Sequence, residues 1–221
     1  MQKFATTAAI AAVLDIPAGR VQLIAADRTD TVVDVRPADA TKSRDLKAAE
    51  QTKVEYTGGV LRIEAGPEKN RLLGPSGSVE VTVQLPAGSS AEVRVASAEV
   101  RGVGRLGDVD VEAALGSVKL DETAGARLTL QAGDVSIGRL GGDAQISTGQ
   151  GDITIAEAGR GKVVLTTQAG DVSISAAAGV SAALDAGTTY GRIQNALKNA
   201  EGAQLEIRAT TAYGDIAARS L

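Results

Sequence analysis

Acidic residues recur at a regular spacing in the second half of this 221-residue chain, and they are its best candidates for chemistry. Each one follows a glycine and precedes a valine or an isoleucine, as in Gly151-Asp152-Ile153. If these segments stack in register as strands, Asp134, Asp152 and Asp171 would lie about 5 Å apart in one row. Carboxylate oxygens in such a row could bind Ca²⁺. They could instead accept hydrogen bonds from backbone N–H groups at their turns, which is the interpretation that we favour.

The full row would contain residues of both charges. In chain order it reads Glu99, Ser117, Asp134, Asp152, Asp171, Arg192 and Asp215. Stacking in that order would put Arg192 between Asp171 and Asp215, where it would neutralise both. In the calcium-binding repeat GGxGxDxUx the Asp comes two residues after a Gly, whereas here it follows the Gly directly. We therefore predict no metal site and no cofactor, and we keep Asp134, Asp152 and Asp171 as the positions to test for a cation.

Two tyrosines occupy equivalent positions, each directly before the glycine of a repeat. Tyr190 and Tyr213 are expected to stack on each other across neighbouring repeats. A sugar-binding platform would require exposed rings, and two rings are few. Packing at the C-terminal end of the stack is the interpretation that we favour.

Several classes of enzyme are excluded by composition. The chain has no histidine and no cysteine, which removes a Ser-His-Asp triad, a thiolate nucleophile and metal sites built from these residues. Acidic residues such as Glu112 and Asp121 are scattered among solvent-facing positions, and aromatic residues that could grip a sugar make up only 2 %. A carbohydrate-active enzyme built on stacked strands is the least favoured alternative. The net charge of −4 argues against a nucleic-acid partner.

Every repeat is expected to contain two short strands joined by turns. The apolar residues that follow the Gly-Asp positions recur at intervals of 17 to 23 residues, and polar residues alternate with apolar ones around them. A second alternating segment lies halfway between. One repeat cannot bury its apolar side alone, so the repeats must stack about 4.8 Å apart around a shared core. The repeat anchors are Gly133, Asp134, Val135, Gly151, Asp152, Ile153, Gly170, Asp171, Val172, Gly214, Asp215 and Ile216.

Residues 1–96 alternate less regularly. We expect them to continue the sheet and to close one end of the stack, with one short polar helix at 38–51. The stretch 4–14 superficially resembles a signal peptide, but no cleavage site follows it in good register, and we favour a first β-strand. The sequence thus predicts a single all-β domain over 1–221, with an irregular part at 1–96 and regular repeats of about 18–23 residues at 97–221.

The chain resembles the actinobacterial branch of the DUF4097 family, the "putative adhesin" β-strand repeat proteins of the toast-rack group. The resemblance covers nearly the whole chain. It rests on 26–37 (ADRTDTVVDVRP), 81–89 (VTVQLPAGS), the repeats, 188–195 (TTYGRIQN) and 208–216 (RATTAYGDI). It implies a right-handed β-solenoid in the cytoplasm, and no known chemistry. Arg192 departs from the Gly-Asp pattern of the repeats.

Together these features predict a non-enzymatic scaffold for protein–protein interaction or self-assembly. The alternative is an adhesin-like module, secreted or at the cell surface, that binds glycans or the cell envelope. We expect a homo-oligomer, in the simplest case a dimer, formed through the last segment, 209–221, because an uncovered strand edge invites pairing. The alternative contact surface is the alanine-rich stretch 176–183, which could instead be a thin part of the core. No stretch reaches the ~18 apolar residues of a membrane span.

Overall fold

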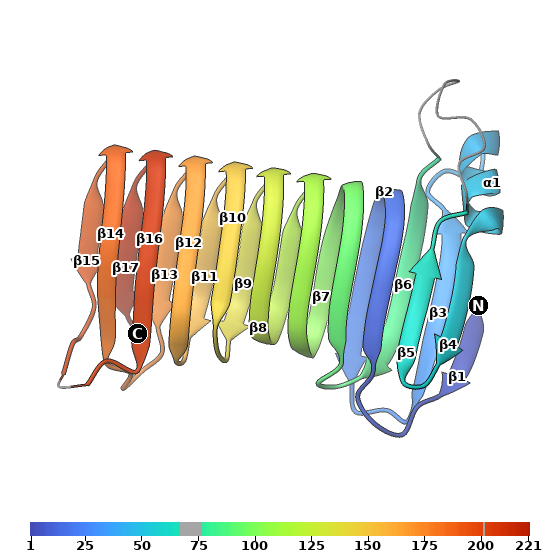
Figure 1. Ribbon diagram of the computed structural model, residues 1–221, viewed down its shortest axis with the longest axis horizontal. Coiled ribbons are helices and arrows are strands. Elements are labelled where there is room, and N and C mark those ends of the chain that lie inside the picture. The colour runs from blue at the N-terminus through green and yellow to red at the C-terminus, as the bar shows by residue number, and fades with distance from the viewer. Residues whose placement is uncertain (67–76, 201) are drawn as a thin grey trace.

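The computed structural model describes residues 1–66, 77–200 and 202–221. In this part of the chain, 17 strands and one helix form an elongated β-solenoid whose strands run across its long axis (Figure 1). In chain order the elements are β1 (Gln2–Ala5), β2 (Ala11–Ala26), β3 (Asp30–Pro37), α1 (Ser43–Gln51), β4 (Lys53–Thr57), β5 (Val60–Glu64), β6 (Val79–Pro86), β7 (Ser90–Leu115), β8 (Val118–Ala132), β9 (Val135–Leu140), β10 (Ala144–Gln150), β11 (Ile153–Ala158), β12 (Gly161–Ala169), β13 (Val172–Ala176), β14 (Ala182–Tyr190), β15 (Ile193–Ala196), β16 (Leu205–Tyr213) and β17 (Ile216–Ser220). The predicted all-β solenoid with one short helix is confirmed.

The strands form two faces that enclose the core. In Figure 1 the front face contains β10, β12, β16 and β14, and the back face contains β9, β11, β13, β17 and β15. The long strands β2, β7 and β8 bend at a corner and belong to both faces. Neighbouring coils pair in parallel and in register, so that equivalent residues of successive repeats lie directly beside one another.

This register produces continuous rows of apolar side chains inside the solenoid. The residues of one row are Val21, Val100, Val118, Val135, Ile153, Val172 and Ile216, and each of them is at most 1 % exposed. The alternating residues point outward, as the period of two requires. Small β-branched side chains fill the narrow space between the faces, which explains a core almost without aromatic rings.

Glycines occupy the corner where the front face turns into the back face. At Gly133, φ is +139°, and an added Cβ atom would lie 1.5 Å from the carbonyl oxygen of Gly116 in the adjacent coil. Gly19 adopts a similar φ of +134° and meets Val79 in the same way, although it lies before residue 97, where the regular repeats were expected to begin. Strand β2 pairs in register with β7, so β2 already belongs to the regular stack. The regular coils therefore begin well before residue 97.

The last two coils stack in the reverse of chain order. Strands β16 and β17 pair with β12 and β13 on one side and with β14 and β15 on the other. Segment 205–221 is therefore inserted into the solenoid, and segment 182–196 forms its end (Figure 1). The expectation that 209–221 is the exposed end of the stack is wrong.

A difference in apolar content explains this reversal. The inserted coil places Leu205, Ile207 and Ile216 in the core, where each is at most 2 % exposed. The end coil has Ala182 opposite Leu205 and Asn195 opposite Ala218. A coil inside the solenoid is covered on both sides, so more apolar surface leaves water when the more apolar coil takes the inner place.

The alanine-rich stretch 176–183 divides between the core and a turn. Ala176 and Ala182 are 0 % and 1 % exposed and belong to the core, whereas residues 177–181 form the turn between them. Ala176 and Ala182 therefore form a thin part of the core rather than a contact face.

The N-terminal part closes the opposite end of the solenoid. Strands β1 and β4 each pair antiparallel with one neighbour, and α1 lies against β3 and β6 (Figure 1). The helix begins at Ser43 rather than at residue 38. The Asp39 carboxylate accepts hydrogen bonds from the N–H and hydroxyl groups of Thr41 at 2.9 and 2.6 Å, and this local turn replaces the first helical turn.

The stretch that resembles a signal peptide contributes two strands rather than one. β1 lies at the back, and the chain crosses at 6–10 to the front before β2 begins. Leu14 and Ile16 are 0 % and 1 % exposed in the core.

Candidate functional site

The aspartates of the repeats lie in one row at the glycine corner, and each binds the backbone of the adjacent coil. Asp134 Oδ1 accepts a hydrogen bond from the Asp152 N–H at 2.9 Å, and Asp152 Oδ1 accepts one from the Asp171 N–H at 2.8 Å. Asp171 Oδ1 binds the Asp215 N–H at 2.7 Å, and Asp215 Oδ1 binds the Arg192 N–H at 2.8 Å. Each carboxylate thus joins two coils through a charge-assisted hydrogen bond.

A threonine three residues before the glycine binds the other side of the same corner. Thr167 Oγ1 donates to the Gly151 carbonyl oxygen at 3.0 Å, and Thr211 Oγ1 donates to that of Gly170 at 3.1 Å. The Gly-Asp peptide turns out of the backbone ladder, so its C=O and N–H need these side chains as partners. The full corner motif is therefore Thr-x-x-Gly-Asp. Sequence reasoning missed the threonine, whose signal is its fixed distance from the glycine.

We expect Thr167→Val to lower the free energy of unfolding by about 1–3 kcal/mol, because the Gly151 carbonyl group would lose its hydroxyl partner. Thr167 is only 3 % exposed, so water cannot readily replace the hydroxyl. Thr154→Val, at an exposed position of β11, is the matched control and should change stability by less than about 0.5 kcal/mol. Urea unfolding of both variants checks this, and equal effects would contradict the role of the corner hydroxyl.

An arginine lies near each end of the row. Arg20 lies between Glu80 and Glu99, with N–O distances of 3.5 and 3.1 Å. Arg192 contacts Asp215 at 2.9 Å. The prediction that it lies between Asp171 and Asp215 is wrong, because Asp215 itself takes the middle place in the reversed order of the coils.

The pKa of the Asp215 carboxyl is lowered, first by the hydrogen bond from the Arg192 N–H and then by that of its guanidinium group. Such a carboxylate stabilises the folded chain above its unfolded pKa of about 3.9, and this contribution is lost as the pH falls through the lower, folded pKa. We expect Asp215→Asn to lower the melting temperature at neutral pH and the difference to shrink below about pH 4. Thermal melts across a pH series measure this, and a constant difference would contradict it.

The aspartates of the row lie one in each coil and do not gather into a cluster. Among the residues that the structure describes, no group of three or more acidic side chains is close enough to hold a metal ion. Asp134, Asp152 and Asp171 each direct one oxygen at a backbone N–H group. The melting temperature in Ca²⁺ compared with that in EDTA tests the cation interpretation.

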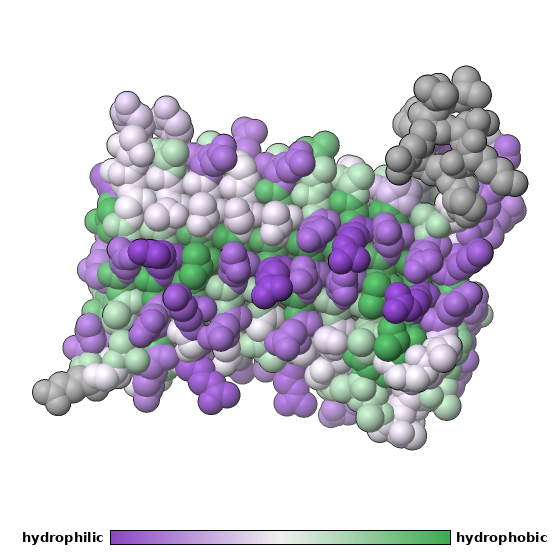
Figure 2. All heavy atoms as spheres, in the orientation of Figure 1, coloured by the Kyte–Doolittle hydropathy of each residue, from purple (hydrophilic) through white to green (hydrophobic). Residues whose placement is uncertain are grey.

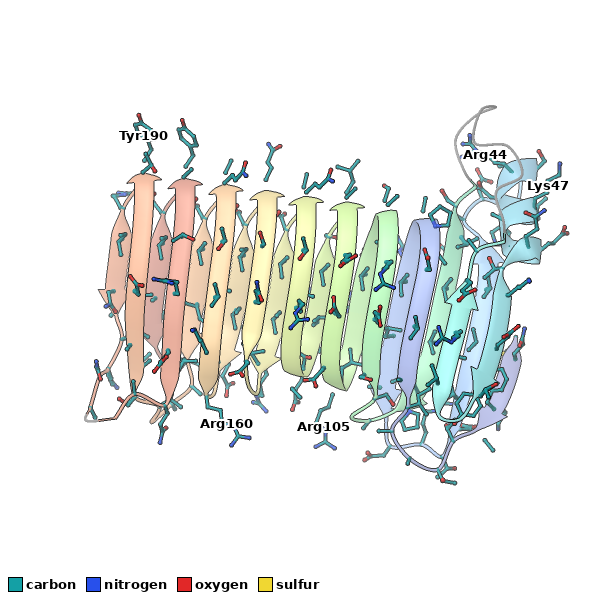
Figure 3. The ribbon with its side chains drawn as sticks, in the orientation of Figure 1. Arg44, Lys47, Arg105, Arg160 and Tyr190 are labelled. Atoms are coloured by element: carbon teal, nitrogen blue, oxygen red, sulfur yellow. The ribbon has the colours of Figure 1, made fainter. Side chains whose placement is uncertain are left out.

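The two tyrosines stack on each other and are exposed. Their ring centroids are 5.0 Å apart and their planes differ by 5°, which confirms the predicted stacking. Tyr190 is 64 % exposed and Tyr213 is 61 % exposed. Figure 3 shows Tyr190 projecting beyond the end of its strand, at the end of the solenoid that segment 182–196 forms. The pair therefore offers aromatic surface to solvent, which packing alone does not require.

A shallow trough of about 840 Å³ lies on the front face over β2, β7, β8 and β10. Burial raises the pKa of the Asp110 carboxyl in this trough, and the Arg127 guanidinium 3.9 Å away opposes the shift. Glu112 instead contacts Arg94 at 3.6 Å, and Asp121 accepts a hydrogen bond from the Gly104 N–H near the back face. Hydrophilic residues are spread along the whole front face rather than gathered at one place (Figure 2).

The end formed by segment 182–196, which we call the open end, exposes part of the core. Ile193 is 45 % exposed, whereas Ile216, its neighbour in the same row, is 0 % exposed. Among the residues that the structure describes, strands β14 and β15 each pair with one neighbouring strand only. The Ala182 N–H at the start of β14 is bonded to the Lys198 carbonyl oxygen, and the rest of the two outer edges faces away from the solenoid. No helix in the described residues is long and apolar enough to cross a membrane.

Comparison with solved structures gives similarities at low identity. A "putative adhesin" from Bacteroides fragilis is 12 % identical with a TM-score of 0.49, over 98 % of this chain and 95 % of that one. A "putative adhesin" from Parabacteroides distasonis is 14 % identical with a TM-score of 0.45, over 100 % and 95 %. A "putative cell adhesion protein" from Clostridium sporogenes is 12 % identical with a TM-score of 0.34, over 100 % and 98 %. No match was found among curated proteins.

Comparison with protein families gives a match over most of the chain. The profile described as Toastrack DUF4097 matches residues 21–220, from the first regular coil to the inserted last one. This range contains the repeat anchors, the aspartates of the row and both tyrosines. The chain belongs to the Toastrack DUF4097 family.

Proposed function

We propose that this protein is a non-enzymatic β-repeat scaffold that binds a protein partner or a second copy of itself. The observation that carries the proposal is the asymmetry of the two ends. The N-terminal end is covered by short antiparallel strands and α1, whereas β14 and β15 leave a strand edge and Ile193 uncovered. Natural sheets usually protect such edges, so an unprotected one suits a contact surface.

The side walls of the solenoid support a scaffold role rather than catalysis. Equivalent residues repeat along a face held together by continuous backbone pairing, which makes the surface rigid. The trough at Asp110 is the place to examine for hydrolysis of glycans. Turnover that is lost in Asp110→Asn would contradict the non-enzymatic proposal.

A pull-down from the native cell with the full chain tests the scaffold. The matched pair of baits is Ile193→Lys, which charges the open end, and Gln145→Lys, which adds the same charge to the exposed middle of the front face. A partner that binds the native chain and Gln145→Lys, but not Ile193→Lys, supports binding at the end. Partners that bind all three baits equally, or none at all, contradict it.

The second candidate function is an adhesin-like module that binds glycans, and the exposed tyrosine pair favours it. Aromatic ring faces bind the apolar faces of sugar rings, and two adjacent rings enlarge that surface. A glycan array probed with the native chain and with Tyr190→Ala tests this. Binding that is lost in the variant supports it.

A cytoplasmic location is part of the scaffold proposal, and the adhesin-like alternative requires export. Fusion of the full-length gene to a reporter that is active only outside the cytoplasm separates the two. Reporter activity at the cell surface would overturn the cytoplasmic proposal.

A further inference from the structure

We propose that the open end binds the open end of a second copy, so that strand β14 pairs antiparallel with β14 of its partner. The inference rests on the proposed function and names the partner for its contact surface.

The edge formed by segment 182–196 lacks the devices that usually keep strands apart. It contains no lysine and no proline, which commonly block edges. Its two charged residues each form an ion pair with the adjacent inner coil, on the exposed surface of the solenoid. Asp185 Oδ2 contacts Arg208 Nε at 3.0 Å, and Arg192 contacts Asp215 at 2.9 Å. At the start of β14 the Ala182 N–H donates to the carbonyl oxygen of Lys198 at 3.1 Å. From Ala183 to Tyr190 the outward side is left with neutral backbone groups and with the half-buried Leu184.

The size of the end matches a small but stable interface. The nine residues of β14 span about 30 Å, and the two faces with their side chains span about 20 Å. One end therefore presents roughly 600 Å², and two ends in contact would bury about 1,200 Å², the lower limit for specific, stable interfaces.

The N-terminal end of a second copy does not suit the open end as a contact surface. Its edge strands β1 and β4 contain only four and five residues. They carry the charges of Lys3, Lys53 and Glu55, and Lys3 is paired with Asp30 at 2.8 Å. Head-to-tail stacking would join unlike edges and would continue into a fibre. Contact between two open ends instead closes after two copies.

A twofold axis between the copies decides how the strands pair. When the axis is perpendicular to the faces, β14 lies antiparallel to β14 of the partner, and the residues from Ala183 to Tyr190 can form a ladder. When the axis runs along the strands, β14 meets the four-residue β15 of the partner. The first arrangement pairs more backbone groups, and it brings the two copies of Ala186, at the middle of β14, close together.

Light scattering of the full chain tests the proposal, with the mass measured up to the highest soluble concentration. The native chain and Gln145→Lys are expected to show twice the chain mass of 22.3 kDa. Ile193→Lys is expected to weaken self-association at least about tenfold. Its circular dichroism and melting curve must resemble those of the native chain. A monomeric native chain, or a dimer unaffected by Ile193→Lys, would overturn the proposal.

Disulfide cross-linking gives an independent result, because the chain contains no cysteine. Under mild oxidation, Ala186→Cys is expected to form a covalent dimer, whereas Gln145→Cys is expected to remain monomeric in denaturing gels. The absence of cross-linking at Ala186, together with a monomeric mass, removes the second copy as the partner. The pull-down decides separately whether the end binds another protein, so the scaffold proposal can survive this failure.

Discussion

Replacing Gly133 with alanine is expected to lower the free energy of unfolding by about 3 kcal/mol or more. The residue has a φ of +139°, which side-chain-bearing residues rarely adopt. Its new Cβ atom would also lie 1.5 Å from the carbonyl oxygen of Gly116. Relief requires moving the backbone of two coils, and that would weaken the hydrogen bonds of the corner.

Urea unfolding followed by circular dichroism measures this effect, with Gly187→Ala as the matched control. Gly187 lies in strand β14 of the end coil, where an added Cβ atom would meet nothing within 4 Å. Its replacement is expected to change stability by less than about 1 kcal/mol. Similar losses for the two variants would show that the corner tolerates side chains.

Replacing Ile216 with alanine is expected to cost about 2–5 kcal/mol, whereas the same change at Ile193 should cost about 1 kcal/mol or less. Both residues occupy the same row of the core, in adjacent coils. Ile216 is 0 % exposed because the coil of Ile193 covers it, and Ile193 is 45 % exposed because no coil covers it. The difference in cost therefore reports which coil is inside.

This pair of variants distinguishes the two orders of stacking. If the coils stacked in chain order, Ile193 would be internal and Ile216 terminal, and the two costs would be exchanged. Thermal or urea unfolding of the full chain measures both. A larger loss for Ile193→Ala than for Ile216→Ala would contradict the inserted position of segment 205–221.

The reversed order also changes what removal of the last segment would do. A chain that ends at residue 200 would lose an internal coil, so β12 and β13 would lose their neighbours β16 and β17. Such a truncation destabilises the solenoid and is a poor test of association at its end. Single substitutions on the end coil, such as Ile193→Lys, remove no coil and are therefore the better test of association.

The aspartate row shows how much of a site can be read from a repeat. The spacing of Gly-Asp-Val/Ile predicts that Asp134, Asp152 and Asp171 share one row, and the register of the strands confirms it. Which backbone group each carboxylate binds could not be predicted, because the donor belongs to the adjacent coil rather than to its own turn. The threonine partner of the corner was missed for the same reason.

The sequence by itself determined the repeat, the alternation and the buried rows. These follow from local chemistry, because a strand with one apolar side buries that side whatever its neighbour is. Only the tertiary structure decided the order of the coils. Segments 188–193 and 211–216 share the pattern Thr-x-Tyr-Gly-x-Ile, so either coil fits beside β12 and β13. The choice depends on the total apolar surface that each order removes from water, and it leaves the coil with Ala182 and Asn195 at the open end.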